Sequence, residues 1–561
     1  MNRVYNHKEW LVWEEHSCPM FLTLTFNAAM KHLEDYIGLS WPTTIVLYES
    51  GQARWLNRWQ DLRAFGQRLI DFLMCLPYHD SFLTALDSSE QSLLQKANEI
   101  QHVINFKDLT NDQLMSQFDD LSKEYYLWYA YGWFCEPISF CIQNLPDGPH
   151  LITDAIEAQI KKCQISVDPK QAAEALFTSE QESFSIAILE DLLRCAEALD
   201  DILLTLESTK NAENAYHTIE MRKDKASKTL LAHLNNHSQK YYWKENNYFS
   251  TYTLSPLDVL SQLLSMPRLE NGRISTKIAA ELEDSRVHRK QVLKLKYELL
   301  NNLPLYYRNL AVLGSSFATL QDRRKRTIMI ANSSFDSILF EVARRTELPI
   351  ALCRQLIPQE LGDFMKDYHH WADRLEARQS CFLVYQGDFS LIDEHVSEIS
   401  GQSSPISLQY SNMEMKEPFT TEGEAAQQFI DQLNSRLNFI LDAEHELRGV
   451  IEGTVAYSNP ESQWITGRVR IIRDPKTERL EEGEILVAPS TTPDYLEVIR
   501  RSKAIVTDWG GQTSHAAIVS RELKKPCIIG TKFASQILSN GEIITLQFPQ
   551  GTIIKEKVNT G

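Results

Sequence analysis

One stretch near the C-terminus combines glycine, hydroxyl and imidazole side chains at a spacing that suits phosphate chemistry. It runs from Val506 to Leu523 and consists of Val-Thr-Asp-Trp-Gly-Gly-Gln-Thr-Ser-His-Ala-Ala-Ile-Val-Ser-Arg-Glu-Leu. The pattern predicts a strand that ends at Thr507, a tight turn at two glycines, and a helix that begins near Ser514. Taken alone, Gly-Gly followed by Ser-His is a common fragment, and an ordinary turn with a helix cap would also explain it.

The predicted helix start makes His515 a candidate nucleophile. Ser514 or Thr513 can cap the helix, which leaves other first-turn N–H groups and the helix dipole to attract an anion. We expect His515 to be exposed, and an imidazole with a pKa near ~6.5 is largely neutral at pH 7 and can attack phosphorus. The expected phosphate-binding residues are those of the turn and cap: Gly510, Gly511, Thr513 and Ser514. We also expect Gly511 to need a positive φ.

This stretch resembles the swivelling phosphohistidine domain of the phosphoenolpyruvate-utilising enzymes, such as phosphoenolpyruvate synthase and rifampicin phosphotransferase. The matching positions include the two glycines, His515, and residues further along the chain: Arg521, Glu522, Leu523, Pro526 and Gly530. Lys524 departs from the family, which usually has glycine there after the helix. The resemblance implies that His515 carries a phosphoryl group and that Arg521 supports its site.

The first 448 residues show no glycine-rich phosphate loop and none of the ATP-grasp signatures of that family. We also expect no phosphoenolpyruvate-binding barrel after the histidine domain. The resemblance therefore implies that the donor site lies on a separate ATP-grasp protein, with Mg²⁺ and ATP bound there. We expect no cofactor and no metal in this chain, because its cysteines lack Cys-x-x-Cys pairs and His233 and His237 lack the glutamate of a zinc protease motif.

Composition narrows the class of protein further. The 561 residues are 43% hydrophobic and 24% charged, with a net charge of −18. Residues 449–561 carry 14 basic and 13 acidic residues, so the acidic excess lies in the remainder, which argues against nucleic-acid binding. No apolar run approaches the ~20 residues of a membrane span. Nine scattered cysteines indicate free buried thiols in a reducing compartment, so we expect a cytoplasmic protein without membrane contact.

Glycine and helical periodicity predict the domain organisation. Ten of the 21 glycines lie in residues 449–561, which favours short strands and loops there and long helices before it. Helical segments are predicted at 55–76, 90–103, 110–133, 155–165, 185–206, 258–264 and 309–345. We therefore predict a large, mostly α-helical N-terminal body (1–375) and a C-terminal swivelling α/β (β/β/α) phosphohistidine domain (447–558). A hairpin from Cys381, a linker from Ser400 to Phe419 and a connecting helix from Glu424 to Leu447 occupy 376–446.

Two features of the helical body could take part in transfer to an acceptor. The aromatic run from Tyr125 to Phe134 could line a pocket for a bulky small molecule, although packing in a buried helix is the commoner use of such a run. The run Arg323-Arg-Lys-Arg326 could meet the phosphohistidine, although a solvated helix face is the more ordinary interpretation.

The leading hypothesis is a phosphotransferase component, incomplete without its partner, that passes phosphate from His515 to a small-molecule acceptor held by the helical body. The alternatives are a non-catalytic regulatory or phosphocarrier module and a degenerate phosphoenolpyruvate synthase-like remnant. The sequence leaves the acceptor and the oligomeric state open.

The break in composition predicts that the C-terminal domain folds alone. A fragment covering residues 446–558 should melt in one cooperative transition, followed by circular dichroism. A fragment that loses its signal gradually, without a transition, would contradict the boundary.

Overall fold

The computed structural model describes most of the chain, namely residues 10–30, 32–33, 38, 41, 44–74, 76–135, 138, 153–203, 211–266, 273–386, 419–428, 450–458, 463–548 and 550–556. The chain divides into two compact units. Unit 1 comprises residues 1–154, 248–250 and 330–451, and unit 2 comprises 155–247, 251–329 and 452–561. The long helix α14 (Leu305–Thr346) contributes its first part to unit 2 and its last part to unit 1.

Unit 1 contains an antiparallel sheet with the strand order β1-β3-β2-β4-β5. Its strands are β1 (Trp10–His16), β2 (Thr44–Glu49), β3 (Gln52–Arg58), β4 (Cys381–Gln386) and β5 (Phe419–Glu422). Strands β2 and β3 form a hairpin through Ser50 and Gly51, whose φ angles of 48° and 92° suit a two-residue turn. This sheet was not predicted, and the helix predicted from Trp55 begins at Trp59 because residues 52–58 form β3.

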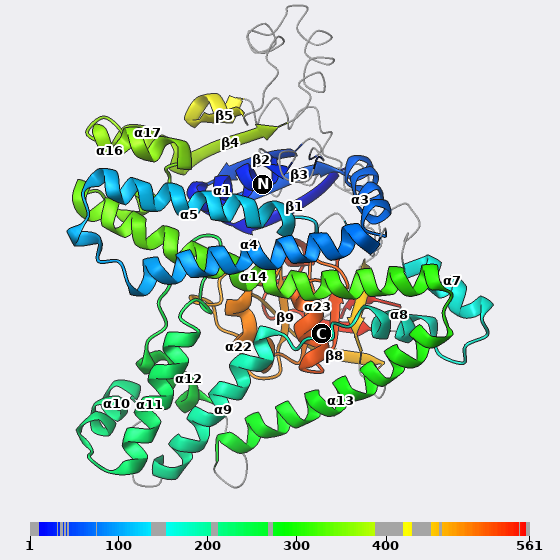
Figure 1. The fold of residues 1–561 in the computed structure, drawn as a ribbon. Helices are drawn as coiled ribbons and strands as arrows, with labels where there is room; N and C mark the ends of the chain where they lie inside the picture. The colour runs from blue at the N-terminus through cyan, green and yellow to red at the C-terminus, as the bar shows by residue number, and fades with distance from the viewer. Residues whose placement is uncertain are drawn as a thin grey trace, which may run out of the picture. The chain divides into compact units, whose positions relative to one another are not determined.

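Helices surround this sheet in unit 1 (Figure 1). They are α1 (Pro19–Met30), α3 (Trp59–Leu73), α4 (Leu76–His102), η1 (Phe106–Asp108), α5 (Asn111–Gly132), α15 (Ile350–Cys353), η2 (Pro358–Glu360), α16 (Leu361–Lys366) and α17 (Ala372–Ser380). The aromatic run of α5 belongs to the core, since Tyr125, Trp128 and Phe134 are almost completely buried. Packing therefore accounts for these aromatic side chains, as the more ordinary interpretation held.

The first part of unit 2 is a series of helices. They are α7 (Thr153–Lys162), α8 (Pro169–Phe177), α9 (Phe184–Leu203), α10 (Ala212–Met221), α11 (Lys225–Lys240), α12 (Pro256–Ser265) and α13 (Ser275–Asn302). Asp168, Asn211, Asp224 and Ser255 each accept a backbone hydrogen bond at a helix start. Leu189, Leu199 and Leu234 are fully buried in the core that α9 and α11 share.

The C-terminal part of unit 2 is the predicted mixed α/β domain. Its sheet has the order β6-β13-β12-β8-β9-β10-β11-β7, in which β8, β9, β10 and β11 run parallel. The strands are β6 (Val450–Glu452), β7 (Thr454–Tyr457), β8 (Trp464–Ile471), β9 (Ile485–Ala488), β10 (Ala504–Thr507), β11 (Cys527–Ile529), β12 (Ile543–Gln547) and β13 (Thr552–Lys555). The helices are η3 (Pro493–Tyr495), α22 (Leu496–Arg501), α23 (His515–Glu522) and α24 (Ala534–Ile537).

The predicted fold class is confirmed: a mostly helical body precedes a C-terminal mixed sheet. Residues 387–392 of the predicted hairpin, residues 400–418 of the predicted linker and residues 429–447 of the connecting helix lie outside the described residues. Among the described cysteines, Cys163 is exposed rather than buried. In the part of the chain that the structure describes, no helix combines the length and the apolar character that a membrane crossing requires.

Candidate functional site

Two loops of the C-terminal domain meet at the carboxyl end of its parallel strands. Because β9 and β10 are parallel neighbours, the loops that follow Ala488 and Thr507 start at the same edge of the sheet. Backbone hydrogen bonds join the loops: Asp508 N donates to Ala488 O at 3.1 Å, and Trp509 N donates to Pro489 O at 2.9 Å. This edge therefore brings residues near 490 and residues near 515 together.

The turn before α23 has the predicted form, with one correction. The left-handed residue is Gly510, with φ of 120°, rather than Gly511. Ser514 is the N-cap: its Oγ accepts a hydrogen bond from Ala517 N at 3.3 Å, while Thr513 is buried at 1% exposure. Arg521, at the end of α23, donates to the backbone and side-chain oxygens of Gln512. The predicted supporting residue thus holds the turn itself.

His515 is buried, with 4% of its surface exposed, which corrects the expectation of an exposed imidazole. Its ring stacks on Phe184, the first residue of α9, with centroids 5.8 Å apart and planes at 14°. Nδ1 lies 3.0 Å from Thr491 Oγ1, and Nε2 is buried without a hydrogen-bond partner. The sequence pattern of α23 could not show this burial, because the covering side chain comes from a helix 331 positions earlier in the chain.

Burial lowers the pKa of His515 to about 3, and the positive charge of Lys325 contributes in the same direction. The imidazole is therefore neutral at physiological pH. Because the pKa of His515 is lower in the buried state than its ordinary value near 6.5, the buried arrangement has its full stability above pH 6.5. That stability is lost progressively as the pH falls toward 3. A neutral ring is the form that can act as a nucleophile.

The basic run of α14 is not a solvated face throughout. Arg324 and Lys325 are 3% and 7% exposed, so the more ordinary interpretation is wrong for these two residues. Lys325 Nζ donates to the carbonyl oxygen of Thr491 at 3.3 Å. The residue whose hydroxyl contacts His515 is thus also bound by a lysine of the helical body, which places a cation beside the imidazole.

Two further aromatic side chains, Trp243 and Tyr241, lie close to the first turn of α9, where Phe184 covers His515. Phe184 meets Trp243 edge-on, with centroids 5.5 Å apart. Tyr241 donates from its hydroxyl to Ala187 O at 2.9 Å, which ties the loop after α11 to the first turn of α9. An apolar wall with a buried nitrogen at its edge resembles a ligand-binding surface in composition.

Two carboxylates contact the N-terminus of α9. Glu522 of α23 accepts from Ser183 N at 3.1 Å and from the Ser183 hydroxyl, and Asp322 of α14 accepts from Phe184 N at 3.0 Å. Burial and the charge of Glu522 raise the pKa of Asp322 to about 8. Burial also raises the pKa of Glu522.

The two described histidines of α11, His233 and His237, offer no comparable site. His237 is fully buried, burial lowers its pKa to about 3, and neither ring nitrogen has a hydrogen-bond partner. His233 and His237 lie on α11, and among the described residues no three His, Cys, Asp or Glu side chains gather as a metal site would need.

Sequence reasoning missed Thr491, Phe184 and Asp322. Thr491 follows the end of β9 by three residues, so its position beside a parallel strand end was an available signal. Nothing in the sequence around Phe184 or Asp322 distinguishes them from other residues of long helices. Their role depends on which helices cover the domain.

The backbone of the glycine turn generates a stability prediction. A Cβ added at Gly510 would lie 2.9 Å from Ser514 Oγ, at a φ that side chains rarely adopt. Gly510→Ala should lower the free energy of unfolding by about 3 kcal/mol, through strain and the disturbed cap. Gly483→Ala is the matched control, because its φ of 87° is also positive but nothing lies within 4 Å. It should cost about 1 kcal/mol. Equal losses in urea unfolding would contradict this account.

Comparison with known proteins gives the C-terminal domain a family. Residues 480–551 match the family model described as PEP-utilising enzyme, mobile domain. The probable phosphoenolpyruvate synthase of Archaeoglobus fulgidus is 44% identical over 94 residues, which are 17% of this chain and 12% of the relative. The phosphoenolpyruvate synthase of Pyrococcus furiosus is 48% identical over 90 residues, or 16% and 11%.

A longer match is to the phosphoenolpyruvate synthase of Aquifex aeolicus, 33% identical over 171 residues, which are 29% of this chain and 19% of the relative. The chain therefore spans less than a quarter of the length of these relatives. The crystal structure of aconitase X from Thermococcus kodakaraensis aligns with 19% of this chain at 17% identity. The alignment covers 98% of the aconitase X chain, and its TM-score is 0.16. Residues 480–551, which include His515, are thus similar to the mobile domain of the phosphoenolpyruvate-utilising enzymes.

Proposed function

We propose that this chain is a phosphotransferase component in which Nε2 of His515 carries a phosphoryl group to a small-molecule acceptor. The observation that carries the proposal is the environment of this one ring within a mobile domain of this family. Nδ1 has a hydroxyl partner, Nε2 has none, and the ring stands at a helix N-terminus beside Lys325.

The hydrogen bond to Thr491 assigns different roles to the two ring nitrogens. When Nδ1–H donates to Thr491 Oγ1, the lone pair of Nε2 is left to attack phosphorus. The new N–P bond forms as the bond from phosphorus to the donor's leaving group breaks. The phosphorylated ring keeps its proton on Nδ1, so in the second step Nε2 leaves with the N–P bond electrons while the acceptor oxygen binds phosphorus.

The surroundings of the ring suit the developing charge. The first-turn N–H groups of α23 and the ammonium of Lys325 can neutralise phosphoryl oxygens, which is how phosphoryl transfer is usually assisted. The wall formed by Phe184 and Trp243 can contact an acceptor. The proposed donor is ATP bound with Mg²⁺ on a separate ATP-grasp protein; the described residues of this chain offer no metal cluster of their own.

The first test concerns the carrier itself. The chain is incubated with Mg²⁺, ATP and a stand-alone ATP-grasp protein from the same genome, and phosphorylated peptides are identified by mass spectrometry at alkaline pH. His515 should carry the label, the label should be lost in acid, and omission of the ATP-grasp protein should abolish it. His515→Ala should remove the label, and His515→Asn should do the same because an amide nitrogen is not nucleophilic. Label that persists at the wild-type level in His515→Ala would refute the proposal.

The second test concerns Thr491. Thr491→Val keeps the side-chain volume but leaves Nδ1 buried without a partner, which costs about 1–3 kcal/mol and corresponds to roughly 5- to 150-fold slower labelling. Thr491→Ser keeps the hydroxyl and should label at close to the wild-type rate. Equal rates for the serine and valine variants would show that the hydroxyl has no part in the reaction.

A further inference from the structure

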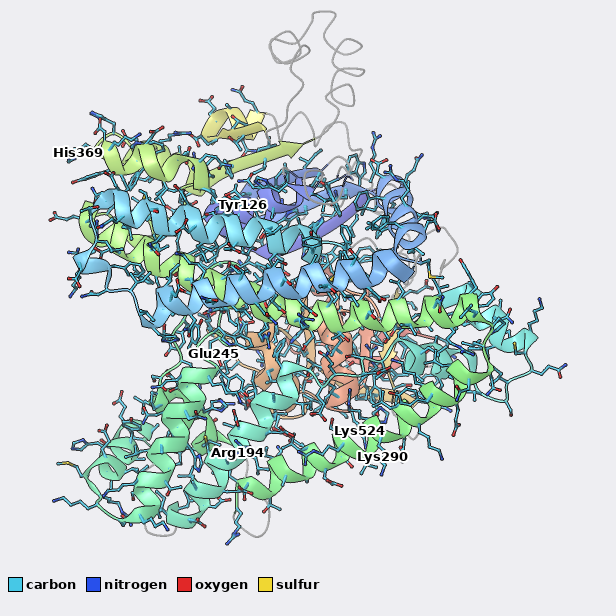
Figure 2. The ribbon with its side chains drawn as sticks, in the orientation of Figure 1. Tyr126, Arg194, Glu245, Lys290, His369 and Lys524 are labelled. Carbon is cyan, nitrogen blue, oxygen red and sulfur yellow. The ribbon has the colours of Figure 1, made fainter. Side chains whose placement is uncertain are left out.

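Ion pairs and hydrogen bonds join the C-terminal domain to the helices of unit 2. Arg500 binds Glu281 at 2.9 Å, Glu497 accepts from Gln262 at 2.5 Å, and Lys524, which is labelled in Figure 2, lies 3.4 Å from Asp284 of α13. Interfaces of this kind resemble those between domains that move relative to each other. The contacts that hold α23, the helix that begins at His515, therefore affect whether the domain can move.

Two carboxylates bind the N-terminus of α9. They are Glu522 of the C-terminal domain and Asp322 of the helical body. Glu522 comes from α23, seven residues after His515, and binds Ser183 through both the backbone N–H and the hydroxyl. Asp322 comes from α14 and binds the next N–H, that of Phe184. Phe184 is also the residue that stacks on His515. The same turn of α9 thus holds both carboxylates and covers the imidazole.

We propose that Glu522 and Asp322 form a proton-dependent clamp that docks the His515 helix on α9. Glu522 is a positioning residue in this arrangement: it acts through α9 and touches neither a substrate nor a reacting atom. The clamp closes when Asp322 takes up one proton, because two neighbouring buried carboxylates are unfavourable when both are ionised. When α23 leaves, Asp322 becomes less buried and loses the nearby charge of Glu522, so it releases the proton.

The other charged groups around Asp322 and Glu522 do not titrate between pH 6.5 and 8. Arg326 of α14 affects Asp322, and Arg289 of α13 and Arg521 of α23 affect Glu522. Arginine stays protonated at all ordinary pH values. His515 titrates in the opposite sense, between 6.5 and about 3, so above pH 6.5 it adds no further dependence. One oxygen of Asp322, Oδ1, is buried without a hydrogen-bond partner and can hold the proton.

The sign of the effect follows from Asp322. Its pKa in the docked state is about 8, raised from the ordinary value of 3.8. An acid with a raised pKa favours docking at low pH, and this contribution is lost as the pH rises through 8. From pH 6.5 to 8, docking should weaken about 15-fold, because Asp322 is still half protonated in the docked state at pH 8. This inference does not rest on the phosphorylation of His515.

The test measures how often the ring is uncovered. Diethyl pyrocarbonate modifies neutral, accessible imidazoles, and exposed His369, whose side chain points outward in Figure 2, serves as the internal reference. The ratio of the His515 rate to the His369 rate, measured by peptide mass spectrometry on the full chain, should rise about 15-fold from pH 6.5 to 8. Glu522→Gln and Asp322→Asn should each make the ratio independent of pH. The control Glu542→Gln, whose carboxylate pairs with Lys555, should keep the wild-type rise.

A ratio that stays flat in the wild-type chain would overturn the clamp, as would a rise of about 15-fold that survives in both Glu522→Gln and Asp322→Asn. Circular dichroism melting of each variant confirms that the fold persists. No phosphoryl donor is present in the assay, so failure of the clamp and failure of the proposed phosphotransferase activity are separate results.

Discussion

The stacking of the His515 imidazole on Phe184 is the contact on which the site depends. It places a neutral ring in a buried position, fixes the N-terminus of α23 against the first turn of α9, and leaves Nε2 without a partner. A buried polar nitrogen without a hydrogen bond costs roughly 1–3 kcal/mol, so the surroundings must compensate for it. The hydroxyl of Thr491 on Nδ1 and the polar contacts of the domain supply that compensation.

Sequence reasoning predicted the C-terminal domain well because its signals are local. The strands at 485–488 and 504–507 are short β-branched runs, and the glycine turn and Ser514 cap lie within ten residues of His515. The departure at Lys524 was also informative: this residue takes a φ of 52°, the left-handed conformation for which the family uses glycine. Turns, helix caps and backbone angles can be predicted from a sequence because neighbouring residues determine them.

The rest of the site depends on contacts between distant segments. Phe184, Asp322 and Thr491 come from three separate elements, and a helical pattern does not show which helix covers which domain. For the same reason the burial of Lys325 was missed, since a basic run on a helix is usually solvated. The hairpin at Ser50 and Gly51 was missed for a different reason, because the helix predicted from Trp55 includes residues that form β3.

The charges around the ring connect phosphorylation with docking. The docked arrangement holds a neutral imidazole and a carboxylate pair whose pKa values are raised, so it accommodates little negative charge. A phosphoryl group on Nε2 would add between −1.5 and −2 charges. Lys325 and the first turn of α23 could offset part of this charge, but the carboxylate of Glu522 on α23 opposes it. Transfer to an acceptor restores the neutral ring, so the discharged domain should dock more tightly than the charged one, which favours the order of steps that a shuttling carrier needs.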